Sequence, residues 1–219
     1  MEEKAKTLFL YYFRLLGLYI LFFIALAIVK ELYPDLFLEN YNQDFLQELL
    51  DENPFKLFVL AVIVAPIIEE MMFRTVLKPT HSELILFVCS WPVFYLNRYI
   101  PLDVHWAIKL AFTAVILFTL HYILKQLIAP ARSLRTRLLL SKYDSTVLVL
   151  TSLVFGFVHI YNYVDDFYVN AALFALIVPR IISGFMLGLI KIKNEYLIWS
   201  ISLHAVNNGV VVLILILTR

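Results

Sequence analysis

The sequence predicts an all-α protein that crosses a membrane several times, as a polytopic transmembrane helix bundle. Of its 219 residues, 62% are hydrophobic and 16% are charged, and the mean hydropathy is +0.84. Soluble domains are about 45–50% apolar and about 25% charged. The apolar residues also lie in runs of about 20, the length that an α-helix needs to cross a bilayer. The net charge of +1 gives no reason to expect a nucleic-acid partner.

Seven segments have the length and composition of a membrane span. We predict spans at residues 7–29, 55–77, 83–97, 104–124, 146–164, 169–190 and 196–217. The third is short and contains Pro92, which favours a kinked or re-entrant helix. The first has a longer apolar run than a signal peptide and no small-residue cleavage site after it, so we expect it to be retained as an anchor.

A short amphipathic helix is predicted after the first span, within the acidic segment ELYPDLFLENYNQDFLQELLDENP. Phe45, Leu46, Leu49 and Leu50 recur there at helical spacing among acidic residues. A helix with one apolar and one charged face can lie on the membrane surface. An ordinary loop helix that covers the bundle explains the same pattern equally well.

The basic residues of the connections predict the orientation. They fall on alternate ends of successive spans, and therefore all on one side of the membrane: Lys4, Lys6, Arg74, Lys78, Lys125, Arg132, Arg135, Arg137, Lys142, Lys191 and Lys193. Lysine and arginine are enriched in cytoplasmic loops, so we expect an integral protein of the plasma membrane with a cytoplasmic N-terminus. The stretch KQLIAPARSLRTRLLLSK is interpreted as a basic cytoplasmic loop, with contact to anionic lipid as the alternative.

Three ionisable residues stand close together in the predicted second span, in VAPIIEEMMFRTVL. Charged groups inside a membrane cost about 2.5–3.5 kcal/mol each on insertion scales, so they usually face a bundle interior. Glu70 and Arg74 are four residues apart and can form an ion pair on one helix face. Glu69 is rotated by about 100° from Glu70 and must find its partner on another helix.

Partners for Glu69 are available on two later spans. His204 and Asn208 lie one turn apart on one face of the seventh span, and Phe155 lies one turn before His159 on the fifth. At about 1.5 Å per residue, Glu69 and His204 lie at similar depths, about 12 and 14 Å from the cytoplasmic ends of their spans. His159 lies deeper, at about 20 Å, which requires the fifth helix to start late or to tilt, or the site to be spread along the membrane normal.

The three motifs together resemble a known family. EEMMFR at 69–74 fits EExxxR, FGFVH at 155–159 fits FxxxH, and HAVNN at 204–208 fits HxxxN. In this order, each in its own predicted span, they are similar to the CPBP family, also called Abi, whose best-known members are the type II CAAX prenyl endopeptidases. The resemblance covers residues 55–215 of what we expect to be a single transmembrane domain, 1–219. The first span and the acidic segment, residues 1–53, lie outside it.

The resemblance implies a bundle of eight helices or similar, a cavity open toward the cytoplasm and the membrane, and glutamate-dependent peptide hydrolysis. The seven spans counted above depart from the eight of the prenyl endopeptidases, so we expect seven or eight. Carried over by position, it implies that Glu69 and His159 hold and deprotonate the attacking water, and that His204 and Asn208 stabilise the oxyanion. Glu70 and Arg74 would brace these groups. The implied partners are membrane lipid and a membrane-associated or prenylated peptide substrate.

The residue types fit this chemistry without the family. A carboxylate in apolar surroundings is a suitable general base for water, and a histidine and an asparagine one turn apart can donate to one oxygen. No cofactor is needed, but Glu69, His159 and His204 could alternatively be three zinc ligands with an open fourth position. No HExxH pattern supports a metal, and Cys89, the only cysteine, excludes a multi-thiolate site.

Three other interpretations remain open. The four polar residues could form a hydrogen-bonded network that only holds the bundle together. The protein could be a non-catalytic membrane scaffold, or a self-immunity factor against a peptide toxin, that keeps the fold without turnover. A transporter is the least favoured interpretation, although paired charges and broken helices also mark ion pathways.

Overall fold

The computed structural model describes residues 2–37, 39, 41–96, 99–101 and 103–218, without the side chains of residues 44 and 45. Within these ranges the chain is all-α and contains no strand, as predicted. The α-helices are α1 (Glu2–Leu32), α2 (Asp44–Glu52), α3 (Pro54–Phe58), α4 (Ala65–Phe73), α5 (His81–Leu96), α6 (Trp106–Leu127), α7 (Pro130–Lys142), α8 (Asp144–Val158), α9 (Ala171–Asn194) and α10 (Leu197–Leu217). Short 3₁₀ helices span Pro34–Phe37 (η1) and His159–Asn162 (η3), and a π-helix spans Val59–Val64 (η2).

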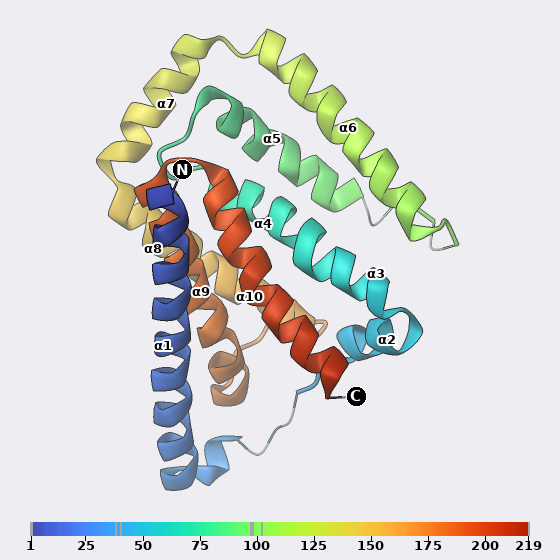
Figure 1. Cartoon of the computed structure of the whole chain (residues 1–219), viewed down its shortest axis with the longest axis vertical. Helices are drawn as coiled ribbons and strands as arrows, with labels where there is room; N and C mark the ends of the chain where they lie inside the picture. Colours follow the sequence, from blue (N-terminus) through green and yellow to red (C-terminus); the bar gives the residue numbers. More distant parts are fainter. Residues whose placement is uncertain (1, 38, 40, 97–98, 102, 219) are drawn as a thin grey trace.

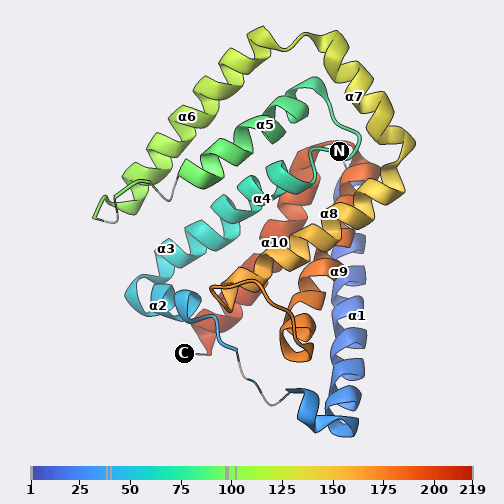
Figure 2. The same ribbon diagram turned by 180° about the vertical axis from the view of Figure 1, so that it is seen from behind.

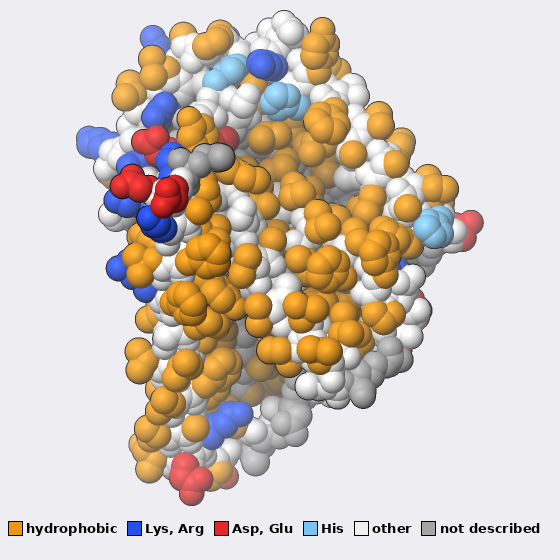
Figure 3. Space-filling view, viewed as in Figure 1, with side chains coloured by type: hydrophobic (Ala, Val, Ile, Leu, Met, Phe, Trp, Pro, Cys, Tyr) orange, Lys and Arg blue, Asp and Glu red, His pale blue; other side chains and the backbone are white. Residues whose placement is uncertain are grey.

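Among the described residues, five helical segments are long and apolar enough to cross a membrane: α1, α6, α8 with η3, α9 and α10. Hydrophobic side chains dominate the face seen in Figure 3, while charged side chains gather near the N-terminal end of α1 and at its other end. The protein is therefore an integral membrane protein. Helix α5 is apolar but has only 16 residues, including Pro92, and matches the predicted short third segment up to Leu96; residue 97 lies outside the described ranges.

The predicted second span is a helix with three successive parts, α3, η2 and α4, that follow one another along a single path (Figure 1). The predicted end at residue 77 was wrong, because the α-helix stops at Phe73 and a turn follows. Lys78 in this connection has a positive φ of 46°. The helical part thus ends just after the two glutamates, which lie in its last two turns.

The basic stretch after α6 was interpreted as a loop, and this was wrong. It contains a helix, α7, which begins at Pro130 in the first helical turn and ends at Lys142. Proline is well tolerated in a first turn, and leucine, arginine and lysine favour helix formation, so the local sequence supports the helix. The loop interpretation gave too much weight to the density of positive charge.

The amphipathic helix after the first span is confirmed as α2. Leu49 and Leu50 are buried against Leu57 of α3 and Val212 of α10. Among the described residues of α2, this apolar face covers the bundle, whereas Gln47 and Glu48 are exposed. The side chain of Phe45, which was part of the predicted apolar face, lies outside the described residues.

Helices α4, α8, α9 and α10 surround the interior that holds the predicted polar residues (Figures 1 and 2). Helix α1 packs along α9 and α10, and the α5–α6 pair packs on the outer side of α4. Two glycines let α8 and α9 approach closely. A Cβ on Gly156 would lie 2.2 Å from Ile181, and one on Gly188 would lie 2.2 Å from Leu148.

A buried ion pair links the ends of three helices. Lys191 near the end of α9 lies 3.0 Å from Glu83 in the first turn of α5. Glu83 also accepts hydrogen bonds from the backbone N–H groups of Thr80 and Leu197, at 2.8 and 3.1 Å. The carboxylate therefore caps α5 and holds the start of α10 beside it, which fixes the helices on which the polar residues stand.

Candidate active site

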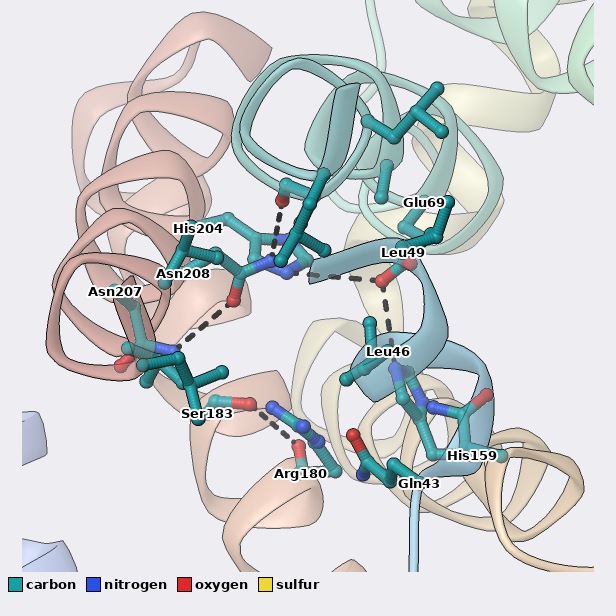
Figure 4. Close-up of a pocket in the computed structure, with 18 of the residues that line it drawn as sticks. Gln43, Leu46, Leu49, Glu69, His159, Arg180, Ser183, His204, Asn207 and Asn208 are labelled. Atoms are coloured by element: carbon teal, nitrogen blue, oxygen red, sulfur yellow. Dashed lines mark hydrogen bonds and ion pairs between the residues drawn. The ribbon is translucent and has the colours of Figure 1, made fainter. Parts of the chain in front are cut away.

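Three side chains from three helices meet inside the bundle (Figure 4). Glu69 comes from α4, His159 caps the C-terminus of α8, and His204 lies in α10. Oε2 of Glu69 lies 3.7 Å from Nε2 of His159 and 3.8 Å from Nε2 of His204. The sequence placed His159 deeper than Glu69 and His204, on the assumption of upright helices. In the structure α8 runs obliquely across the bundle, which brings His159 to the level of the other two residues (Figure 2). One carboxylate oxygen thus faces two imidazole nitrogens.

Glu70 contacts a histidine as well as the predicted arginine. Its Oε2 lies 3.5 Å from Nε of Arg74, and both side chains are fully buried. Its Oε1 lies 3.0 Å from Nδ1 of His204. An ionised carboxylate only accepts hydrogen bonds, so Nδ1 of His204 carries a proton and its Nε2 turns toward Glu69. Glu70 therefore orients His204.

The backbone orients His159 in the same way. Nδ1 of His159 lies 2.6 Å from the carbonyl oxygen of Phe155, one turn earlier in α8. A carbonyl only accepts, so Nδ1 is the protonated nitrogen. In the neutral imidazole, Nε2 then has a free lone pair that points toward Glu69. The FxxxH spacing thus supplies a hydrogen bond from the phenylalanine's backbone in addition to the ring contact between Phe155 and His159, whose centroids are 4.6 Å apart.

A π-helical turn and a proline position Asn208. In a π-helix each N–H group bonds to the carbonyl five residues earlier, as Ala65 does to Leu60. The next residue, Pro66, has no N–H group to offer to the Ala61 carbonyl. Nδ2 of Asn208 donates to this carbonyl at 2.9 Å instead. The amide of Asn208 is fixed by one of its two hydrogens, which leaves the second free to donate elsewhere.

Arg74 is enclosed by aromatic rings and a glycine. Its guanidinium carbon lies 4.7 Å from the ring centroid of Phe155 and 5.9 Å from that of Phe73. A Cβ on Gly184 would lie 3.3 Å from Nη2 of Arg74 and 3.2 Å from Cδ1 of Phe155, tighter than normal contacts. The absence of a side chain at Gly184 therefore makes room for the arginine that balances Glu70.

A cavity of about 440 Å³ lies beside these groups, a size typical of ligand sites. Glu69, Phe155, His159, Arg180, Ser183, His204, Asn207 and Asn208 line its polar part. The apolar part is lined by Leu46 and Leu49 of α2, Leu57, Leu60, Ala61 and Ala65 of the α3–α4 helix, and Val211, Val212 and Leu215 of α10. Helix α2 thus covers the cavity on the side of the C-terminal end of α10 (Figure 1).

The cavity extends toward one end of the bundle. Its lining residues on α10 run from His204 toward Leu215, away from the end that holds the N-terminus and α7. The predicted cytoplasmic opening and the predicted cytoplasmic N-terminus both stay predictions.

The structure brings together all six residues singled out from the sequence: Glu69, Glu70, Arg74, His159, His204 and Asn208. Sequence reasoning missed the contact between Glu70 and His204, because helical spacing relates only residues of one helix. It also missed the link between Ala61 and Asn208. The pair Ala65–Pro66 within an apolar helix was the available signal for this link, since a proline inside a helix always frees a carbonyl.

The zinc alternative rests on Glu69, His159 and His204. Among the described residues, no group of three or more histidine, cysteine, aspartate or glutamate side chains is found arranged to hold a metal ion. The Nε2 atoms of both histidines nevertheless face one oxygen of Glu69, at 3.7 and 3.8 Å, and each Nδ1 bonds to a carbonyl or a carboxylate, as is common in metal-binding histidines. The three side chains therefore fit a zinc ion by type, but they do not form a preformed metal site.

The fold and site define a helical integral membrane protein with a buried glutamate–histidine centre beside a cavity. Residues 51–210 match the family described as type II CAAX prenyl endopeptidase Rce1-like, which is roughly three quarters of the chain. The chain belongs to this family, within the CPBP or Abi group, as its motifs predicted. Neither the curated proteins nor the solved structures contain a match.

Proposed function

We propose that this protein is an intramembrane endopeptidase that hydrolyses a peptide bond of a membrane-associated or lipidated peptide. The observation that carries the proposal is the arrangement of Glu69 between the Nε2 atoms of His159 and His204, at 3.7 and 3.8 Å. These distances are too long for direct hydrogen bonds, and Oε2 of Glu69 is buried without a hydrogen-bond partner among the described residues. A water that enters beside these groups would supply the missing hydrogen bonds. Membership of a family of prenyl endopeptidases supports a peptide substrate.

In the proposed reaction, Glu69 takes a proton from a water that also donates to Nε2 of His159. The oxygen of this water attacks the carbonyl carbon of the peptide bond, and a tetrahedral oxyanion forms. His204, protonated on both nitrogens, donates from Nε2 to the oxyanion while Nδ1–H stays bonded to Glu70. Asn208 donates its second amide hydrogen. Collapse of the intermediate breaks the C–N bond, and Glu69 passes its proton to the leaving amine.

The surroundings support these roles. The Glu69 side chain keeps about a quarter of its surface exposed, toward the cavity, whereas Glu70 and Arg74 are fully buried. The partly exposed side chain of Glu69 can therefore meet water and substrate in the cavity, although its Oε2 atom is buried, and the buried Glu70 orients His204 through Nδ1. Adjacent glutamates thus take different tasks because successive helical residues point to different surroundings.

The substitution Glu69→Gln tests the proposal. It keeps the volume of the side chain but removes the base, so we expect cleavage of a farnesylated peptide to fall at least about 10²-fold while the thermal midpoint in detergent stays unchanged. Glu48→Gln on the exposed face of α2 is the matched control, and full activity is expected. A Glu69→Gln enzyme with undiminished activity would exclude Glu69 from the mechanism.

The metal question needs its own measurement. We propose a reaction without a metal, because the sequence has no HExxH pattern and no group of three or more histidine, cysteine, aspartate or glutamate side chains among the described residues is arranged to hold a metal ion. Purified protein with less than stoichiometric zinc, and turnover that survives a chelator, would support this proposal. Activity that depends on one bound zinc per chain would replace it by the alternative with Glu69, His159 and His204 as ligands.

We further propose that the whole chain is one transmembrane domain with seven crossings and a cytoplasmic N-terminus, in the plasma membrane. The continuous α3–α4 helix and the short α5 supply two crossings in addition to the five long helices. The basic residues then lie on the cytoplasmic side. Under this orientation the cavity beneath α2 receives peptide from the opposite side or laterally from the membrane.

A non-catalytic scaffold or self-immunity protein is the remaining alternative. Such a protein would need the polar centre only for stability, so Glu69→Gln would lower the thermal midpoint or change nothing that can be measured. The partial exposure of Glu69 to the cavity argues against a purely stabilising role, because a buried network gains little from a solvent-facing carboxylate.

A further inference from the structure

Arg180 is a cation inside the same cavity that none of the proposed catalytic steps uses. It stands in α9 directly after Pro179 and lines the cavity with Glu69 and His159. No aspartate or glutamate among the described residues lies within 4.0 Å of its side-chain nitrogens, whereas Arg74 pairs with Glu70 and Lys191 with Glu83. Its cationic group thus differs from those of Arg74 and Lys191, which are paired.

The depth of Arg180 in the membrane limits which anions can pair with it. It lies nine residues after Ala171 and 14 residues before Asn194, about 14 and 21 Å from the two helix ends. An arginine at such a depth is costly unless it meets an anion or water. A lipid phosphate lies at the membrane surface, so a headgroup is too far away to be the regular partner of Arg180. An anion that enters the cavity can reach Arg180, because this residue lines the cavity.

The neighbours of Arg180 leave its charge available. Figure 4 shows its side chain close to Ser183 and Gln43, which are uncharged. Ser183 donates its hydroxyl to the Arg180 carbonyl at 2.9 Å, and Gln43 donates to the Tyr163 hydroxyl at 2.6 Å. Tyr19 of α1 and His159 lie near enough to interact electrostatically with the guanidinium of Arg180, but neither is a carboxylate that could neutralise it.

We propose that Arg180 binds the free C-terminal carboxylate of the peptide substrate and so determines which peptides are cleaved. This inference rests on the proposed peptidase function. A guanidinium binds a carboxylate through two parallel hydrogen bonds, which fixes both position and direction. With the terminal carboxylate on Arg180 and an internal peptide bond beside Glu69, the enzyme releases a short C-terminal fragment. The apolar part of the cavity takes the apolar side chains or lipid of the peptide.

The experiment compares two S-farnesylated peptides that differ only at the C-terminus, one a carboxylic acid and the other a carboxamide. Binding is measured to full-length Glu69→Gln protein in detergent, where no turnover is needed, and cleavage is measured with the wild type. A bond from arginine to a charged group predicts about 10- to 100-fold tighter binding of the acid. Arg180→Gln should remove this preference by weakening the acid alone, and Arg180→Lys should retain part of it.

Controls separate specific binding from other causes. Arg135→Gln, at an exposed position of α7, should keep the full preference for the acid. Equal binding of the two peptides to Glu69→Gln protein, or equal losses for both peptides in Arg180→Gln, would overturn the proposal. So would an Arg180-dependent requirement for phosphatidylglycerol vesicles with an unchanged preference between the peptides, which would identify a lipid phosphate as the anion.

The two proposals fail in different ways. Preferential binding of the acid without any wild-type cleavage would contradict the peptidase function and leave the carboxylate site intact. Cleavage of both peptides at equal rates would support the peptidase function and contradict the carboxylate site at Arg180. A further experiment reverses both charges. The Arg180→Glu variant should bind a peptide that ends in a cationic aminoethylamide more tightly than the peptide that ends in a carboxylic acid.

Discussion

Nδ1 of His204 lies 3.0 Å from Oε1 of Glu70, and the other oxygen of this carboxylate faces Arg74 at 3.5 Å. One buried carboxylate therefore contacts two cationic or potentially cationic groups from different helices. Oε1 of Glu70 accepts from Nδ1–H of His204, while Oε2 faces the guanidinium of Arg74. In the proposed reaction His204 carries a proton on both nitrogens, because only that form can donate from Nε2 to an oxyanion while Nδ1 remains bonded to Glu70.

The substitution Glu70→Gln should affect both stability and catalysis. It leaves Arg74 buried without a counter-charge, and loss of one partner of a buried pair costs about 3–5 kcal/mol. It also removes the charge that favours the imidazolium, so we expect kcat to fall at least about 10²-fold. Thermal unfolding and kinetics, measured beside Glu69→Gln, test this. A normal midpoint for Glu70→Gln would show that the pair with Arg74 contributes little.

The substitution Pro66→Ala should lower activity by misplacing Asn208. Alanine supplies an N–H group that can bond to the Ala61 carbonyl in place of the asparagine. We expect a loss of about 10-fold or more in kcat, approaching the effect of Asn208→Ala, with little change in stability. Pro92→Ala in α5, away from the cavity, is the matched control. Full activity of Pro66→Ala would mean that the hydrogen bond to Ala61 does not position Asn208.

Gly184→Ala should destabilise the protein, although alanine normally favours helices. The new methyl group would lie 3.3 Å from Nη2 of Arg74 and from the Cα atom of Ser152, and the backbone contact cannot move aside easily. Overpacking of this kind costs about 1–3 kcal/mol. Gly17→Ala in α1 meets nothing within 4 Å and should raise stability by about 0.5–1 kcal/mol. Thermal midpoints that change equally in both variants would contradict this account.

The ion pair between Glu83 and Lys191 should show strong coupling. Each single substitution, Glu83→Gln or Lys191→Met, leaves one buried charge unpaired and should destabilise by about 3–5 kcal/mol. The double variant should lose less than the sum of both. Because neither Glu83 nor Lys191 lines the cavity, we expect kcat of the folded variants to stay within about threefold of the wild type. Additive losses in the double-mutant cycle would rule out the coupling.

Labelling with an impermeant maleimide can determine which side of the membrane the cavity faces. In a Cys89→Ser background, a cysteine is placed at the exposed Glu48 of α2 or at Arg135 of α7. The positive-inside distribution predicts that intact cells label Glu48→Cys and that Arg135→Cys reacts only after permeabilisation. The opposite pattern would place the cavity on the cytoplasmic side and would make the distribution of basic residues misleading for this chain.

The spacing of residues within single helices determined much of this site in advance. Glu70 and Arg74 pair because four residues make about one helical turn, and His159 bonds to Phe155 for the same reason. Hydropathy determined the all-α membrane fold, since a long apolar segment in lipid must satisfy its backbone hydrogen bonds internally as a helix. Local charge was less reliable, because α7 is a helix where a basic loop was expected.

Only the tertiary structure decided how the helices face one another. Local spacing cannot show that Glu70 meets His204, that Asn208 replaces the missing N–H group of Pro66, or that α2 covers the cavity on the side away from the N-terminus. These contacts depend on the tilt of α8, on the π-helical turn and on the close packing that Gly184 allows. The sequence alone thus determined which polar groups lie within the membrane, and packing decided which of them meet.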